Sequence, residues 1–291
     1  MTWKRVATAL VLIPIVVAIV LFTSTAVVAI VTAIITVLAL WEYFALGDAI
    51  GHRAYRLWTV LSGLLMIFAQ WHAMQMQIKP LEGKVYVDYF GDFLKTSHFT
   101  SFDVFFLFVL GLTVPTLFTR RPLVEAIPAA GISSSALLLV AFPLSFAVRL
   151  QGIPGYGPRL LLFALVITWA ADTTAYFVGR AIGKHPLAPH ISPKKTWEGS
   201  IGSMFGSLLV AYAFSSWIRI PLPHLLIMAA SGNIAGQMGD LLESAYKRSA
   251  GVKDSGGLLP GHGGILDRID ALILCIPVIW YYLVLVNPPA L

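Results

Sequence analysis

The sequence predicts an all-α polytopic integral membrane protein, and three observations support this fold class. Of the 291 residues, 58% are hydrophobic and only 12% are charged, which is about half of the roughly 25% charged residues typical of soluble domains. The mean hydropathy is +0.81. Apolar stretches of roughly 20 residues, the length that crosses a bilayer, recur along the whole chain. We therefore expect residues 1–291 to form a single membrane-embedded domain.

Nine apolar stretches are long enough to be membrane spans. They cover residues 6–22, 25–46, 57–76, 99–118, 126–148, 159–179, 200–218, 222–243 and 265–286. The first follows two basic residues as a signal peptide would, but its length and the apolar stretch directly after it favour a retained helix. We expect residues 1–150 to hold helices of low motif content and residues 159–286 to hold the catalytic helices and cytoplasmic loops.

The distribution of Lys and Arg predicts a cytoplasmic N-terminus, because basic residues are more frequent on the cytoplasmic side of a membrane. With nine spans in this orientation, 13 of the 20 basic residues lie in inside segments, six lie outside, and Arg268 lies at a helix start. The two polar loops 180–199 and 244–264 then face the cytoplasm, where nucleotides are. We therefore attribute the net charge of +6 to basic residues on the cytoplasmic side of a membrane protein, and we expect no nucleic-acid partner.

Carboxylates inside apolar stretches are the first candidates for a functional site, because an ionisable group in a span is costly. Asp172 lies about two-thirds of the way along 159–179, on a stripe of small residues that would otherwise serve helix packing. Asn233, Gln237 and Asp240 recur at helical spacing and share one face of 222–243. Hydrogen bonding to a neighbouring helix would account for Asn233 and Gln237, but it accounts poorly for Asp240.

The last apolar stretch opens with Asp267 and Asp270, which project from one face of its first turn. A favourable interaction with the helix N-terminus would explain one of them. Together with Asp240 they supply the oxygen-rich ligands that Mg²⁺ prefers, usually completed by water and substrate phosphates. We predict these three carboxylates to be metal ligands. The single cysteine, Cys275, is predicted to have a packing role.

Two loops offer groups that bind anions. Glycine is concentrated between residues 256 and 264, where successive backbone N–H groups and the following helix N-terminus would hold an anion. The loop "HPLAPHISPKKTWEGS" carries Lys194 and Lys195 in a proline-stiffened segment, with Thr196 or Ser192 as the cap of the next helix. A cytoplasmic anchor explains the two lysines as well as phosphate binding does. Carboxylates, cations and glycines together indicate phosphoryl or nucleotidyl transfer to a substrate held in the bilayer.

The stretch "SAYKRSAGVKDSGGLLPGHGGILDRID", residues 244–270, resembles the signature of the phosphatidate cytidylyltransferases (CDP-diacylglycerol synthases). One departure is Tyr246, where that family usually has an aliphatic residue or Phe. The upstream segments "ADTTAYFVGRAIGK", "ISPKKTWEGSIG" and "GDLLES" also look like blocks of the family. The resemblance is strong over residues 168–270 and only general before them. The matching positions are Ser244, Lys247, Arg248, Lys253, Asp254, Gly256, Leu259, Pro260, His262, Gly263, Gly264, Asp267, Arg268 and Asp270.

The resemblance implies transfer of cytidylyl from CTP to phosphatidate, which yields CDP-diacylglycerol and pyrophosphate, at the cytoplasmic face of a bacterial-type inner membrane. It implies Mg²⁺, permits a second, monovalent cation such as K⁺, and leaves a homodimer open. The expected catalytic residues are Asp240, Asp267, Asp270, Lys253 and Arg268. The expected substrate-binding residues are Asp172, Lys194, Lys195, Ser244, Lys247, Arg248, Asp254, Gly256, Gly257, His262, Gly263 and Gly264.

Two other functions compete with this reading. A CTP-dependent lipid kinase would transfer the γ-phosphate of CTP to a polyprenol-type alcohol, but the match through Lys253–Asp254 and on to Asp270 argues against it. An ion-coupled transporter would use Asp172 and Asp240 as an ion path, but it would not need a glycine-rich cytoplasmic loop.

Overall fold

A computed structural model describes residues 2–77, 99–258 and 263–286, and nearly all of its elements are helices. A short two-stranded sheet is the exception among the described residues. The helices are α1 (Thr2–Phe22), α2 (Thr25–Ala49), α3 (Arg56–Gln77), α5 (Ser101–Phe118), η1 (Leu123–Glu125), α6 (Ala126–Ala136), η2 (Leu137–Ala141), α7 (Phe142–Gln151), α8 (Gly157–Ile182), α9 (Trp197–Phe214), α10 (Leu222–Ser249) and α11 (Leu266–Val286). The strands are β1 (Pro186–Ala188) and β2 (Ser192–Thr196).

Among the residues that the structure describes, six helical segments are long and apolar enough to cross a membrane, which supports the predicted class of integral membrane protein. They are Thr25–Ala49, Arg56–Gln75, Ser101–Phe118, Leu123–Gln151, Gly157–Ile182 and Leu266–Val286. The predicted span 126–148 is one such segment, which continues through the single π-helical turn η2. All nine predicted ranges coincide with helical segments. Because α9 and α10 are not among these segments and α1 counts only as the shorter apolar helix Leu10–Phe22, the count of nine spans stays a prediction.

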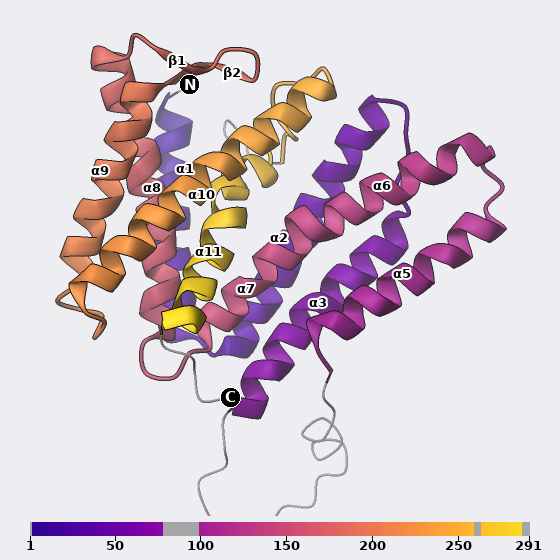
Figure 1. Cartoon of the computed structure of the whole chain (residues 1–291), viewed down its shortest axis with the longest axis horizontal. Coiled ribbons are helices and arrows are strands. Elements are labelled where there is room, and N and C mark those ends of the chain that lie inside the picture. The colour runs from indigo at the N-terminus through magenta and orange to yellow at the C-terminus, as the bar shows by residue number, and fades with distance from the viewer. Residues whose placement is uncertain (1, 78–98, 259–262, 287–291) are drawn as a thin grey trace, which may run out of the picture.

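The helices form two groups that meet along α7 and α11 (Figure 1). One group contains α2, α3, α5, α6 and α7, and the other contains α8, α9, α10 and α11 with α1 packed on α8. Phe44 of α2 and Phe163 of α8 are among the largest fully buried side chains, so both groups contribute to one apolar core. Cys275 is buried and free, and it packs near Gly232 of α10, as predicted for a packing role.

Close approach of α8 and α9 depends on small residues. A Cβ on Gly199 would lie 3.5 Å from the Cα of Gly179, and a Cβ on Gly202 would lie 2.7 Å from Val178. The small-residue stripe around Asp172 therefore does serve helix packing, as one of the two interpretations proposed.

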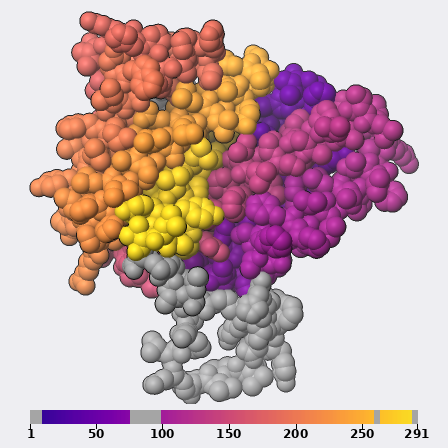
Figure 2. Space-filling view, in the orientation of Figure 1, coloured from indigo at the N-terminus to yellow at the C-terminus, as the bar shows by residue number. Residues whose placement is uncertain are grey.

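The segment between α8 and α9, predicted to be a stiff loop, is an antiparallel hairpin in which Pro186 pairs with Thr196 and Ala188 with Ser192. The Trp197 amide donates to the carbonyl of His185 and closes the hairpin onto α9. The hairpin lies at the end of the molecule where α1 begins, whereas α11 ends at the opposite end (Figure 1). It projects beyond the group of α8, α9 and α10, as Figure 2 shows.

Candidate functional site

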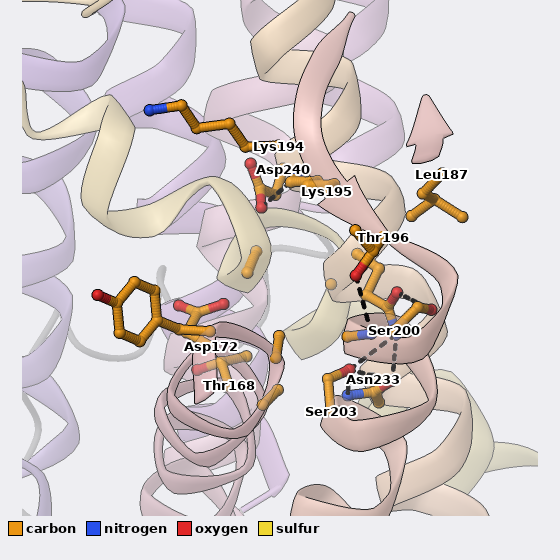
Figure 3. Close-up of a pocket in the computed structure, with 17 residues that line it drawn as sticks. Thr168, Asp172, Leu187, Lys194, Lys195, Thr196, Ser200, Ser203, Asn233 and Asp240 are labelled. Carbon is orange, nitrogen blue, oxygen red and sulfur yellow. Dashed lines mark hydrogen bonds and ion pairs between the residues drawn. The ribbon is translucent and has the colours of Figure 1, made fainter. Parts of the chain in front are cut away.

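A cavity of about 260 Å³ lies between α8, α9 and α10, beneath the hairpin (Figure 3). The hairpin contributes Leu187 and two lysines to its wall, and α11 contributes Ala271. Its polar lining residues are Thr168, Asp172, Tyr176, Lys194, Lys195, Thr196, Ser200, Ser203, Asn233, Gln237 and Asp240. The cavity thus gathers polar residues from the predicted spans 159–179 and 222–243 and from the segment that carries Lys194 and Lys195.

Two of the predicted carboxylates reach this cavity from different helices. Asp240 of α10 forms an ion pair with Lys195 of β2, with 2.5 Å between Nζ and Oδ2, and both side chains are less than one-third exposed. Asp172 of α8 lies on the same cavity wall as Thr168 (Figure 3) and interacts electrostatically with Asp240, Lys195 and Arg268. The pairing of Lys195 with a carboxylate therefore links the hairpin to the helix bundle.

The other wall of the cavity is a polar contact between α9 and α10. The Asn233 amide nitrogen donates to the hydroxyls of Ser203 and Ser207 at 3.0 and 2.9 Å. The Ser200 hydroxyl donates to the Gln237 amide oxygen at 2.5 Å, and the Gln237 amide nitrogen donates to Ser203 at 2.9 Å. Hydrogen bonding to a neighbouring helix, the predicted structural role of Asn233 and Gln237, is confirmed.

The start of α9 anchors the hairpin. The Thr196 hydroxyl accepts a hydrogen bond from the Gly199 amide at 3.1 Å, so the predicted N-cap is confirmed. In the first turn of the helix, the carboxylate of Glu198 lies 2.6 Å from the Nδ1 atom of His185 and accepts a hydrogen bond from the His185 backbone amide. The hydrogen bond from His185 is the largest cause that lowers the pKa of Glu198 to about 2. Glu198 is therefore an ionised anchor for the segment that carries Lys194 and Lys195.

A second polar cluster lies at the C-terminal end of α10. Lys247 is buried and forms ion pairs with Glu243 and with Asp267, the latter at 2.6 Å. The other carboxylate oxygen of Asp267 accepts hydrogen bonds from the backbone amides of Ser255 and Gly264 at 3.0 and 2.8 Å. The helix α10 continues past residue 243, the predicted end of the span, as far as Ser249. The two ion pairs of Lys247 offset the free-energy cost of burying its charge there.

Glu42 of α2 also belongs to this cluster, although the sequence reasoning did not select it. Its carboxylate accepts hydrogen bonds from the backbone amides of Ile265 and Leu266 at 2.9 and 2.8 Å, and from the Ser255 hydroxyl at 3.0 Å. The signal that could have found Glu42 was the rule already applied to Asp172, since Glu42 lies inside the apolar stretch 25–46.

Carboxylates of the protein accept hydrogen bonds from backbone amides at both ends of the predicted anion-binding loop before α11. In the described part of the loop, the amides of residues 255, 264, 265 and 266 donate to Asp267 or Glu42. A Cβ on Gly256 would lie 2.5 Å from the Glu42 carboxylate, so the glycine permits close approach of that side chain. The expectation that the loop 256–264 holds a triphosphate stays a prediction. His262 lies outside the described residues.

The predicted metal triad is not assembled in the described structure. No three His, Cys, Asp or Glu side chains in residues 2–77, 99–258 and 263–286 form a group that could hold a metal ion. Asp267 is occupied by Lys247 and by backbone amides, whereas Asp270 interacts electrostatically with Asp240, Asp172 and Glu243. Asp240 is likewise paired, with Lys195. Because Mg²⁺ is usually bound by one or two carboxylates plus substrate phosphates, the assignment of Asp240, Asp267 and Asp270 as metal ligands stays a prediction.

The remaining predicted residues divide between the two clusters and the surface. Arg248 donates to the carbonyl groups of Ile191 and Val252, which ties α10 to the hairpin. Ser244 is buried in α10. Arg268 is exposed on α11 and acts electrostatically on Asp172. Of the predicted site residues in the loop, Lys253, Asp254 and Gly257 are exposed.

Comparison with known proteins identifies the family. Residues 3–286 match the cytidylyltransferase family. The chain belongs to this family. The match covers both helix groups, so it extends well beyond the segment 168–270 that carried the resemblance in the sequence.

Individual relatives match about half of the chain. A phosphatidate cytidylyltransferase of Bacillus subtilis is 39% identical over 157 residues, which are 53% of this chain and 58% of the relative. One of Haemophilus influenzae is 44% identical over 135 residues, 44% of this chain and 47% of the relative. One of Staphylococcus saprophyticus is 43% identical over 148 residues, 50% of this chain and 55% of the relative. The chain thus spans about half the length of the curated cytidylyltransferases that it matches.

Proposed function

We propose that this member of the cytidylyltransferase family transfers the cytidylyl group of CTP to phosphatidate, with CDP-diacylglycerol and pyrophosphate as products. The observation that carries the proposal is the cavity beneath the hairpin, where Asp172 and Asp240 face Lys195 at the end of a bundle of apolar helices. A cavity at this place is accessible to a water-soluble nucleotide and to a phosphate held by a lipid. The names of the relatives support the same reaction.

In the proposed reaction, an oxygen of the phosphatidate phosphate attacks the α-phosphorus of CTP. A new P–O bond forms, the bond from the α-phosphorus to the oxygen that bridges to the β-phosphorus breaks, and pyrophosphate leaves with that oxygen. Both reactants are polyanions, so the chief task of the protein is to position them and to neutralise their charge. Lys194, Lys195 and Arg268 are the cations that we assign to the phosphates.

The ion pair of Lys195 with Asp240 has a role in this proposal. It holds the lysine at the cavity wall before substrates bind. The lysine side chain therefore loses less conformational entropy when substrates bind. Mg²⁺, when held by Asp240 and Asp270 with substrate phosphates, would neutralise charge on the phosphates and orient them. The ion pair of Lys247 with Asp267 joins the C-terminal end of α10 to the start of α11, whereas the predicted roles were substrate binding for Lys247 and metal binding for Asp267.

The position of the label in CTP tests the reaction. Purified protein in detergent is incubated with phosphatidate, Mg²⁺ and CTP labelled at either the α- or the γ-phosphate. We expect the α-label in the lipid and one pyrophosphate released for each lipid formed. Transfer of the γ-label would instead indicate a lipid kinase. The absence both of label in the lipid and of pyrophosphate release would favour an ion-coupled transporter.

We further propose that the chain crosses a bacterial inner membrane nine times, with its N-terminus and the cavity on the cytoplasmic side. The agreement of all nine predicted ranges with helical segments supports this topology. The hairpin, which carries Lys194 and Lys195, lies at the end of the molecule where α1 begins (Figure 1), as the excess of basic residues in the inside segments requires.

A further inference from the structure

A second cavity, of about 360 Å³, lies in the other helix group, and it is lined by Asp48, Arg53, Arg56 and Arg121. The first three residues belong to the end of α2, the connection to α3 and the start of α3, and Arg121 lies between α5 and η1. None of the four lines the cavity beneath the hairpin or belongs to the clusters around Lys195 and Lys247. We call these four residues the arginine site.

Two of the guanidinium groups are held in place by the protein. Arg56 forms an ion pair with Asp48 and lies over the Trp41 ring, 5.6 Å from its centroid. Arg121 donates from Nη1 to the carbonyl of Arg53 at 2.6 Å and lies over the Tyr55 ring, 5.7 Å from its centroid. Groups held in this way lose little freedom when they bind a ligand.

The charge of the arginine site is unbalanced. Three guanidinium groups face one carboxylate, and that carboxylate is paired with Arg56. Within the described residues, Arg53 has no ion pair, although it lines the cavity. A planar guanidinium binds phosphate oxygens through two parallel hydrogen bonds, so a cluster with two surplus arginines favours a phosphate group.

The position of the site relative to the apolar helices decides the source of that phosphate. The site lies where the candidate spans Thr25–Ala49 and Ser101–Phe118 end and where Arg56–Gln75 and Leu123–Gln151 begin. Charged residues at the ends of spans lie at the level of the lipid headgroups, whichever side of the membrane they face. Large apolar side chains beside the site are exposed, including Trp41 at 58%, Leu57 at 76% and Phe118 at 81%, and lipid chains would cover them.

We propose that the arginine site binds the headgroup phosphate of an anionic phospholipid, at a place separate from the cavity beneath the hairpin. The acyl chains of that lipid lie against the exposed apolar residues of α2, α3 and α5. A zwitterionic lipid carries a cation next to its phosphate and gains less from the surplus arginines.

Native mass spectrometry of the full chain in detergent tests this site, with phosphatidylglycerol, phosphatidylcholine or inorganic phosphate as the added ligand. The informative variant is Arg53→Gln, because the Arg53 side chain has no ion pair in the described structure whose loss would disturb folding. The matched control is Arg120→Gln, which removes the same charge from an exposed neighbour of Arg121 that does not line the site.

We expect Arg53→Gln to weaken binding of phosphatidylglycerol about tenfold, which is the loss of one charge-assisted hydrogen-bonding group, and Arg120→Gln to change it less than about twofold. An equal loss in both variants would mean general attraction of charge and would overturn the proposal. Equal binding of phosphatidylcholine, or displacement of phosphatidylglycerol by millimolar inorganic phosphate, would also overturn it.

Discussion

Asp240 of α10 and Asp267 of α11 have different partners. Asp240 lines the cavity and pairs with a lysine of the hairpin, which leaves it close to where substrates would bind. Asp267 is buried among Lys247 and backbone amides, where its charge satisfies donors that would otherwise lack acceptors. Two aspartates from adjacent helices therefore differ in their surroundings because their partners differ.

Glu42 is expected to stabilise the start of α11. Glu42→Gln keeps the shape of the side chain but replaces one acceptor oxygen with a donor, facing the amides of Ile265 and Leu266. We expect the free energy of unfolding, measured by titration with a denaturing detergent, to fall by about 1.5–3 kcal/mol. The control Glu125→Gln breaks a partly exposed pair with His52 and should cost less than about 1 kcal/mol. Equal effects of the two variants would contradict this role.

The two aspartates are distinguished by comparing turnover with stability. We expect Asp240→Asn to lower kcat at least a hundredfold with little change in the thermal midpoint, because it alters the charge at a partly exposed cavity wall. Asp267→Asn should lower the thermal midpoint, because Lys247 loses one of its two buried partners. A thermal midpoint that falls more in Asp240→Asn than in Asp267→Asn would show that the assignment is reversed.

At the scale of elements, the approach of α10 to α11 determines how close Asp240 and Asp270 lie. A Cβ on Gly239 would clash with the Asp270 carbonyl oxygen, so the helices touch through this glycine. We expect Gly239→Ala to reduce the free energy of unfolding by about 1–3 kcal/mol. A Cβ on Gly257 would meet nothing within 4 Å, so Gly257→Ala is the control, and unchanged stability in both variants would exclude a tight contact here.

The hairpin is expected to stay anchored to α9 in mild acid. The pKa of Glu198 falls from 4.5 to about 2, mainly through the hydrogen bond from His185. A depressed pKa in the folded state means that the contribution of Glu198 is complete above the ordinary pKa and is lost only as the pH falls toward about 2. Hydrogen exchange of residues 186–196, corrected for the intrinsic rate, should therefore show protection that persists at about pH 4. Loss of protection in the native chain between neutral pH and about pH 5 would contradict this role of Glu198. In the variant Glu198→Gln, the protection of residues 186–196 should be lost already at neutral pH.

At the scale of the whole molecule, the proposed topology places the hairpin and the α9–α10 turn on opposite sides of the membrane. With the buried Cys275 removed as Cys275→Ala, Ser192→Cys labels the hairpin and Ser216→Cys labels the turn. We expect a membrane-impermeant maleimide to modify the Ser216 variant in intact spheroplasts and the Ser192 variant only after lysis. The opposite labelling pattern would show that the chain has the opposite orientation in the membrane.

Much of this protein could be predicted from local patterns. Apolar stretches of spanning length mark the helices because a bilayer requires every backbone group to be hydrogen-bonded within its own segment. The cap at Thr196 and the polar face of Asn233 and Gln237 depend only on neighbours along one helix, and both are confirmed. The hairpin strands were missed, because a segment rich in proline and short of alternating apolar residues carries no strand pattern.

By itself, the sequence determined the helical membrane class, the positions of the helices and the family to which the chain belongs. Only the tertiary structure decided which charges are paired with one another. Glu42 and Ile265 are more than 200 residues apart in the chain, and Lys247 meets Asp267 from another helix. The partners of each carboxylate, whether backbone amides, lysines or a metal ion, depend on these contacts in space. Hydrogen bonds and ion pairs act over a few ångströms, whatever the separation of the residues along the chain.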